Sequence, residues 1–253
     1  MQTQTRRFAL AVAVLSAFIS AGSLVAQTDD DANRFRPIDV FDLEWASDPQ
    51  ISPDGEWIAY VRNSMDVMSD RRRANIWVIR FDGSDHRPIS SGTSNASSPR
   101  WSASGDRLLY VSSAEGSSQL YVRWMVTGQT AKLTNLTRSP SSVTWSADGQ
   151  WIALSMRVDD SPEPLAKMPK APKGAEWAKP PRVVERLIYR ADGAGFLDPA
   201  FTHKFVLPAE GGTPRQVTSG DFNHGGSVSW SPDGRSFLLS ANRHDDWQYE
   251  PAN

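Results

Sequence analysis

The stretch Trp230-Ser231-Pro232-Asp233-Gly234 is one copy of a turn motif that occurs four times along the chain. The other copies are Gln50-Ile51-Ser52-Pro53-Asp54-Gly55, Trp101-Ser102-Ala103-Ser104-Gly105 and Trp145-Ser146-Ala147-Asp148-Gly149. Each copy leads directly into an apolar stretch, such as Trp151-Ile152-Ala153-Leu154. A turn-and-strand unit repeated at this scale is typical of a β-propeller, in which each repeat forms one blade.

The residue types in the motif explain why the chain turns there. Proline presets φ, aspartate accepts hydrogen bonds from backbone amides ahead of it, and glycine adopts positive φ. Two copies have alanine in place of proline, whereas glycine stands in all four. We therefore predict that the glycines are the structural residues of the turns. They are Gly55, Gly105, Gly149 and Gly234.

Further apolar segments supply partners for the strands that follow the turns. Residues 76–79 and 120–122 are predicted third strands, and the short outer strands are predicted at 87–89, 131–134 and 215–218. The predicted fold class is therefore all-β, a partial β-propeller with about three and a half four-stranded blades. An all-β sandwich with a chance repetition is the alternative. Three and a half blades cannot close a ring, so we expect a fragment or closure with a second copy, and open sheet edges that favour aggregation.

The spacing of the motif glycines predicts an insertion. They follow one another after 50, 44 and 85 residues, and the long interval equals one blade plus an insertion at 159–203. Its first part, 161–181, contains six of the 17 prolines and four lysines, so it cannot be a core strand. It is either a surface loop or an arm that reaches toward a partner domain or a substrate entrance. Residues 183–189 are strand-like, and 190–195 form a Gly-rich turn.

The N-terminus resembles a secretory signal peptide. Residues 1–26 contain Arg6 and Arg7, an apolar core from Phe8 to Ile19, and small residues before Ala26. The apolar core is too short for a permanent membrane span, so we expect an exported protein, periplasmic or secreted, with no stable membrane anchor after cleavage. Residues 27–36 are a predicted linker, and the pattern at 37–45 predicts a short amphipathic helix on the first blade. The propeller domain is assigned to 37–253.

Composition excludes several kinds of chemistry. The chain has no cysteine, so disulfides, thiol catalysis and thiolate metal sites are excluded. Its formal net charge is −2, which gives no general attraction for nucleic acid. The Gly-x-Ser-x-Gly element of a serine nucleophile is absent, and the four histidines do not have the spacing of a helical metal pair. We therefore predict no catalytic residue, no metal and no cofactor in this chain.

Two histidines have aspartates nearby in the sequence. His224 could pair with Asp221, and His244 with Asp245 and Asp246; we predict local hydrogen bonding in loops for both.

Several of these stretches together resemble a known family. Ser47-Asp48-Pro49-Gln50-Ile51-Ser52-Pro53-Asp54-Gly55, Tyr189-Arg190-Ala191-Asp192-Gly193-Ala194-Gly195 and Ser240-Ala241-Asn242-Arg243 are similar to the N-terminal propeller of prolyl oligopeptidase family (S9) serine peptidases. The branch of acylaminoacyl-peptidases and dipeptidyl-aminopeptidase-like enzymes is the most similar. TolB-like propellers share the Trp-Ser-Pro-Asp-Gly element.

The resemblance implies a function. In this family the propeller caps a C-terminal α/β-hydrolase domain with a Ser, Asp, His triad and admits short peptides to it. We expect that this domain is absent here and that the chain is the substrate-gating part of an exported peptidase, with peptides as partners. Asp246-Trp247-Gln248-Tyr249-Glu250 resembles an element by which dipeptidyl peptidase IV-like members hold a substrate's amino terminus, which makes Tyr249 and Glu250 candidate substrate-binding residues. Pro251 departs from that pattern.

Two other functions stay open. A TolB-like propeller could serve as a non-enzymatic binding module of the cell envelope, and it would then have no hydrolase domain. Carbohydrate hydrolysis needs two carboxylates that converge, and adjacent aspartates on one strand point to opposite faces. The sequence does not indicate the oligomeric state.

Overall fold

The computed structural model describes residues 34–160, 169–178 and 182–249. The signal peptide predicted at 1–26 and most of the linker lie outside this part. Contacts divide the chain into two compact units at Asp42 and Leu43. In the first unit, η2 (Pro37–Asp42) is a 3-10 helix without buried residues. The prediction of a helix to Trp45 is wrong, because Trp45 begins strand β1 and pairs with Asn63.

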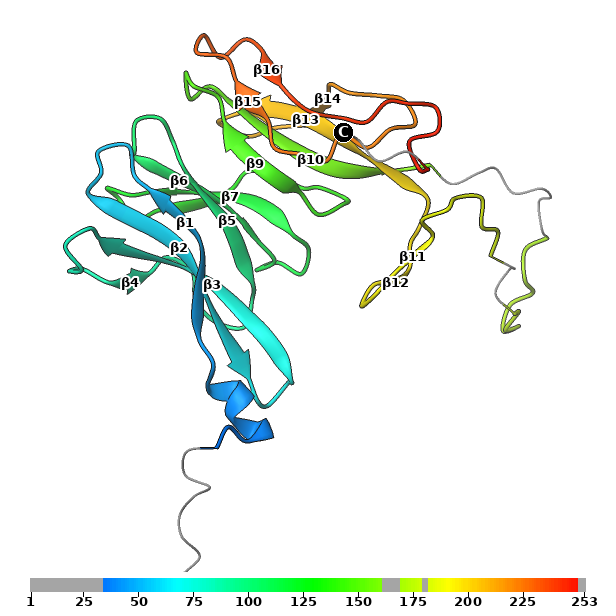
Figure 1. Cartoon of the computed structure of the whole chain (residues 1–253), viewed down its shortest axis with the longest axis horizontal. Helices are drawn as coiled ribbons and strands as arrows, with labels where there is room; N and C mark the ends of the chain where they lie inside the picture. The colour runs from blue at the N-terminus through cyan, green and yellow to red at the C-terminus, as the bar shows by residue number, and fades with distance from the viewer. Residues whose placement is uncertain (1–33, 161–168, 179–181, 250–253) are drawn as a thin grey trace, which may run out of the picture. The chain divides into compact units, whose positions relative to one another are not determined.

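The second unit contains three four-stranded antiparallel sheets in chain order (Figure 1). The first sheet consists of β1 (Trp45–Ile51), β2 (Trp57–Asp66), β3 (Arg71–Arg80) and β4 (Arg87–Pro88). The second consists of β5 (Ala96–Trp101), β6 (Arg107–Ser112), β7 (Gln119–Trp124) and β8 (Thr130–Lys132). The third consists of β9 (Ser141–Trp145), β10 (Trp151–Asp159), β13 (Ala200–Pro208) and β14 (Arg215–Gln216). A hairpin of β15 (Ser229–Trp230) and β16 (Phe237–Leu238) follows, so the predicted three and a half units are confirmed.

The four motif turns have one geometry. The glycines have φ of +75°, +75°, +69° and +67° in chain order, in the region that other residues rarely adopt. In each turn the glycine N–H donates to the carbonyl of the motif serine, at 2.9 to 3.0 Å. The Oγ of that serine also accepts from a backbone amide at the start of the next strand, as Ser146 does from Trp151 at 2.9 Å; in the fourth turn the donor is Ser236, one residue before β16. The serines of the first three turns are buried, so they are structural residues that the sequence reasoning missed.

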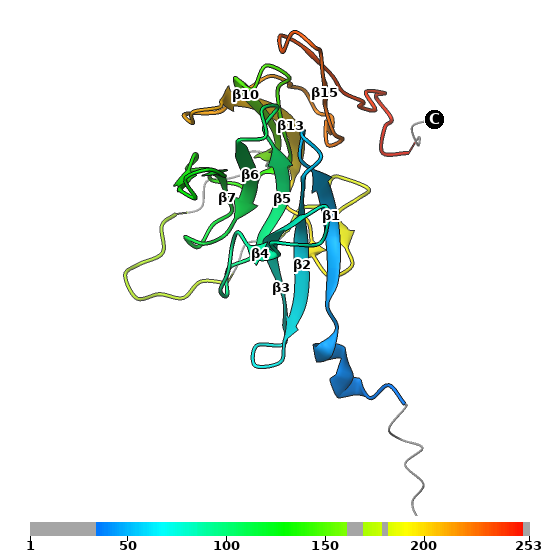
Figure 2. The same ribbon diagram turned by 90° about the vertical axis from the view of Figure 1, so that its left-hand side faces the viewer.

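The hydrophobic core lies between neighbouring sheets. In β6, Leu108 and Leu109 are both 0 % exposed, but Leu108 packs in the cluster with the first sheet and Leu109 in the cluster with the third. Consecutive strand residues point to opposite faces, so the second sheet is buried on both sides. Figure 2 shows β1 to β3 beside β5 to β7. In β2 only alternate residues such as Ala59 and Val61 are buried.

Two indoles connect successive sheets. The Nε1 of Trp101 donates to the carbonyl of Gln50 at 3.0 Å, and the Nε1 of Trp145 donates to the carbonyl of Arg100 at 3.0 Å. Both tryptophans belong to the turn motif, and both acceptors lie in the preceding sheet. The motif tryptophan therefore connects the second sheet to the first and the third sheet to the second. The indole N–H of Trp230, in the fourth copy, has no such partner among the described residues.

The third sheet contains a long loop, residues 160–199, between its second and third strands. β10 and β13 pair from Trp151↔Pro208 to Asp159↔Ala200, so pairing resumes at Ala200 and not at 203. The strand predicted at 183–189 is wrong: Val183 and Val184 are 56 % and 47 % exposed and belong to no strand. The edges of β10 are already occupied by β9 and β13, so an additional strand has no partner there. The loop instead contains the small hairpin of β11 (Arg190–Ala191) and β12 (Gly195–Phe196).

Candidate functional site

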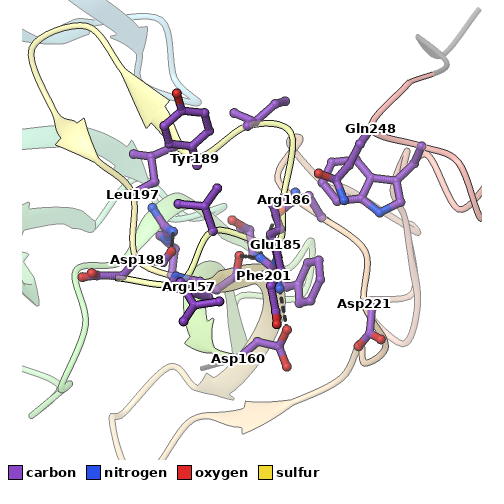
Figure 3. Close-up of a pocket in the computed structure, with 18 of the residues that line it drawn as sticks. Arg157, Asp160, Glu185, Arg186, Tyr189, Leu197, Asp198, Phe201, Asp221 and Gln248 are labelled. Atoms are coloured by element: carbon purple, nitrogen blue, oxygen red, sulfur yellow. Dashed lines mark hydrogen bonds and ion pairs between the residues drawn. The ribbon is translucent and has the colours of Figure 1, made fainter. Parts of the chain in front are cut away.

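A cavity of about 610 Å³ lies at one end of the third sheet. The end of β10, the start of β13, the long loop 160–199 and the segment with Trp247 and Gln248 form its walls (Figure 3). We call it the rim pocket. Because Asp159 and Ala200 are paired at this end of the sheet, both ends of the loop emerge beside the pocket. The fold thus brings together segments that are far apart in the sequence.

Arginines and acidic residues make up the charged part of the rim pocket. Arg186 forms an ion pair with Asp160 and donates to the carbonyl of Ala200 at 3.1 Å. Arg157 donates to the carbonyl of Asp198 at 2.8 Å. These three contacts connect the loop to the ends of β10 and β13, so they position the walls of the pocket. In these contacts Arg157 uses one of its N–H groups and Arg186 uses both terminal nitrogens, so these atoms bind partners within the protein.

The aromatic part of the rim pocket centres on Phe201 at the start of β13. The Arg186 guanidinium lies 4.0 Å from the centroid of its ring, and the ring of Trp247 meets it edge-on at a centroid distance of 6.3 Å. The side-chain carbonyl of Gln248 accepts from the Leu187 amide at 2.9 Å. The segment after the β15–β16 hairpin is therefore held against both β13 and the loop.

The side chains that line the rim pocket are suited to binding a ligand. Glu185 and Asp221 line it, and the described residues give neither carboxylate an ion-pair partner. Apolar walls with a few charged groups are suited to a peptide. Within the described part of the chain, no group of three or more acidic or histidine side chains could hold a metal ion. A helix long and apolar enough to cross a bilayer is also lacking among those residues.

The structure describes only one of the two predicted substrate-binding residues. Tyr249 is 71 % exposed and does not line the rim pocket, and Glu250 lies outside the described residues. Their neighbours Trp247 and Gln248 do line it, which the sequence reasoning missed. The aromatic pair within the quoted element was the available signal, but its partner Phe201 is distant in the sequence. His224 does not pair with Asp221 as predicted, since its ring contacts Arg243 at 2.8 Å.

Known proteins share both the sequence pattern and the fold. Residues 41–169 match the family described as PD40, TolB beta propeller domain. A Bacillus subtilis (strain 168) protein named uncharacterized peptidase YuxL is 29% identical over 205 residues, 81% of this chain and 30% of that protein. Dipeptidyl-peptidase 5 of Porphyromonas endodontalis is 25% identical over 184 residues, 72% of this chain and 25% of that protein.

A solved structure of Pyrococcus horikoshii acylaminoacyl peptidase, uncomplexed, superimposes with a TM-score of 0.58. It is 20% identical and covers 82% of this chain and 29% of its own, so this likeness shows the fold alone. The chain spans less than a third of the length of these relatives. The repeated turns, the successive four-stranded sheets and the sequence match agree: the chain belongs to the PD40 family of TolB beta propeller domains, and the relatives that share its sequence are S9 family peptidases.

Proposed function

We propose that this chain is the substrate-gating propeller portion of an exported serine peptidase of the acylaminoacyl-peptidase or dipeptidyl-aminopeptidase type. The observation that carries the proposal is the sequence relationship over 81% of the chain to a peptidase of which it spans 30%. In this proposal the hydrolase domain contains the nucleophile, and the chain described here selects the peptides that reach it. The signal-like pattern in residues 1–26 supports export to the periplasm or the medium.

The rim pocket is the proposed contact for the peptide. Its aromatic wall of Phe201 and Trp247 provides apolar surface, and Glu185 and Asp221 provide carboxylates without ion-pair partners among the described residues. Binding energy from such a site away from the scissile bond can orient a substrate. Glu250 stays a proposed contact for a free amino terminus, on the resemblance of the element that contains it.

The test uses the protein that carries this chain, purified from its source organism. We expect a fluorophosphonate probe to label it and dipeptidyl or acylaminoacyl nitroanilides to be hydrolysed. Trp247→Ala should raise KM several-fold, while the rate of probe labelling stays unchanged because the nucleophile is elsewhere. The matched control is Phe81→Ala, a 68 % exposed aromatic residue outside the rim pocket.

The alternative is a TolB-like binding module, and it is kept because the matching family is described as the TolB beta propeller domain. In that case the protein would show neither labelling nor turnover. A protein that is labelled but whose KM is the same with and without the Trp247→Ala substitution would retain the peptidase and exclude the rim pocket as a substrate contact.

A further inference from the structure

Four basic side chains lie together between β13 and the segments that follow it. We call them the basic cluster: His203, Lys204, His224 and Arg243. Lys204 and His224 are 0 % exposed, and His203 is 4 % exposed. Among the described residues no carboxylate bonds to any of the four. Charged groups are rarely buried without an opposite charge, so the cluster needs a physical explanation.

The amino group of Lys204 is hydrogen-bonded to uncharged oxygen atoms alone. Its Nζ donates to the Ser155 Oγ at 2.7 Å and to the carbonyl of Gly226. Burial lowers the pKa of Lys204. Ser155 is also 0 % exposed, so this lysine and serine have no access to a substrate and serve to fix the chain at Gly226.

His224 is held beside β13 by its backbone and by Arg243. Its N–H donates to the carbonyl of Thr202 at 2.7 Å, and its Nε2 lies 2.8 Å from the Arg243 Nη2. A guanidinium can only donate, so Nε2 accepts, and the imidazole is neutral with its proton on Nδ1. That Nδ1 is buried without a hydrogen-bond partner in the described part of the chain.

The basic groups that face His224 oppose a positive charge on it, and only the backbone of Phe222 favours one. The basic groups are His203 and Lys204 on β13, and Arg243 on the segment after β16; the His203 and His224 ring centroids are 5.4 Å apart. Burial is the largest cause of the lowered pKa of His224, followed by Arg243, His203 and Lys204. Asp221 is the acidic group on the same segment, and its charge acts on His203.

The bond between Arg243 and His224 is connected to the rim pocket. Arg243 is four residues before Trp247, which contacts Phe201, and five before Gln248, which accepts from the Leu187 amide. Thr202, which accepts the His224 N–H, lines the same pocket. Arg243 thus fastens the start of the segment whose end forms the pocket wall.

We propose that the Arg243–His224 hydrogen bond is an acid-sensitive latch that holds Trp247 and Gln248 in the wall of the rim pocket, and that protonation of His224 opens it. A protonated ring has no lone pair on Nε2 to accept from Arg243, and two cations would then meet without a bonded carboxylate. The latch regulates the site of the proposed function, and its biological meaning rests on that function.

Hydrogen exchange of residues 242–249, measured by mass spectrometry on the whole chain and corrected for intrinsic rates, tests the latch. The amides of Trp247 and Tyr249 are hydrogen-bonded and report on the segment. With an ordinary histidine pKa near 6.5 in the open form, the opening equilibrium should rise about fivefold between pH 6.5 and 5.5. His224→Gln keeps an acceptor that does not titrate, so its exchange should be independent of pH.

Two further variants complete the test. Arg243→Gln should exchange at pH 7.5 as fast as the unmodified chain does at pH 5.5, and His86→Gln, a histidine of the first sheet bonded to Tyr60, should behave as the unmodified chain. An unmodified chain without the acid-induced rise, or a folded His224→Gln variant that retains it, overturns the latch. If His224→Gln does not fold, Arg243→Gln decides, and unchanged protection in it overturns the latch. The exchange experiment contains no peptide substrate, so a result that overturns the latch does not contradict the proposed function.

Discussion

The serine of each turn motif holds the turn closed through its backbone and its hydroxyl group, beside the glycine that allows the positive φ. Ser146 is 1 % exposed; its N–H donates to the carbonyl of Trp151, and its Oγ accepts from the Trp151 amide and donates to Asp148. This exchange closes the loop between two strands. The sequence predicted the glycine from its backbone freedom. It did not predict the serine, because a small polar residue beside Pro or Asp is equally common in exposed loops.

The turn at Gly149 gives a prediction for single residues. Gly149→Val should lower the free energy of unfolding by roughly 1 to 2 kcal/mol, because φ there is +69° and a branched side chain disfavours it. The nearest atom to an added Cβ is 4.0 Å away, so the loss would come from the backbone and not from a clash. Urea denaturation measures it. Ala147→Pro, which copies the first and fourth turns, is the control and should keep or slightly raise stability.

Asp66 gives a prediction about pH. Bonds from Ser69 Oγ, then from the Arg73 guanidinium and the Met68 amide, lower the pKa of Asp66 to about 2. Its pKa is lower in the folded state, so its contribution to stability is complete above about pH 4 and is lost as pH falls toward 2. Amide exchange at Ser69 should therefore accelerate in this window. In Asp66→Asn it should be fast throughout, and a pH-dependent loss of protection in that variant would exclude the assignment.

At the level of elements, the sheets are connected by the indoles of the turn motif. Trp145 is 7 % exposed, and its N–H reaches a carbonyl of the preceding sheet. The first strands also share a bulge, in which Asp48, Ser98 and Ser142 have positive φ although they are not glycines. At the bulge of the first sheet the Asp48 carboxylate accepts from Arg100 of the second at 2.8 Å. The three sheets thus contact one another through side chains of the turn motif and of the bulge, which both recur in the repeat.

Removal of one indole N–H tests this connection. Trp145→Phe keeps an aromatic ring but leaves the carbonyl of Arg100 without its donor, so it should cost about 1 kcal/mol of unfolding free energy. Guanidinium denaturation of both proteins gives the difference. Trp151→Phe, at a 38 % exposed position of the same sheet, should be close to neutral. Equal losses in the two variants would mean that the hydrogen bond contributes nothing.

The elements that could be predicted are those defined by local sequence. The repeated turns identified the first two strands of each sheet, and β-branched and aromatic runs identified the third strands of the first two sheets. Residues 183–189 have the same local pattern, but both sides of β10, the strand before the loop, are already paired with β9 and β13. Strand formation requires a partner, and these residues pair with none. β13 was missed because its polar residues His203 and Lys204 are buried through contacts with distant segments.

For the molecule as a whole, the first sheet differs from the other two in its exposed face. Ile51 pairs with Ile58 on the face opposite to Ala59, and it is 62 % exposed. The second and third sheets bury the corresponding tryptophans, Trp101 and Trp145, more fully. Exposed apolar sheet surface favours association between molecules.

The rim pocket could be located only with the whole fold known, since its walls come from segments distant in sequence.

Association should therefore depend on the exposed face of the first sheet. Ile51→Glu should weaken self-association of the isolated chain about tenfold, which corresponds to about 1.4 kcal/mol. Sedimentation velocity over a range of concentrations measures the effect. Val126→Glu, at a 91 % exposed position in the second sheet's outer turn, is the control and should associate as the unmodified chain does. A chain that is monomeric at all concentrations would contradict this prediction.

The loop 160–199 leaves and rejoins the third sheet at the directly opposed residues Asp159 and Ala200. A hairpin with that spacing can be closed by a turn of a few residues, so the loop can be exchanged for another without a change in strand register. Under the proposed function, differences in peptide preference between relatives can therefore arise in this one loop while the three sheets stay constant. Foreign loops could be grafted between the same two residues to give the sheet a binding surface of another chemistry.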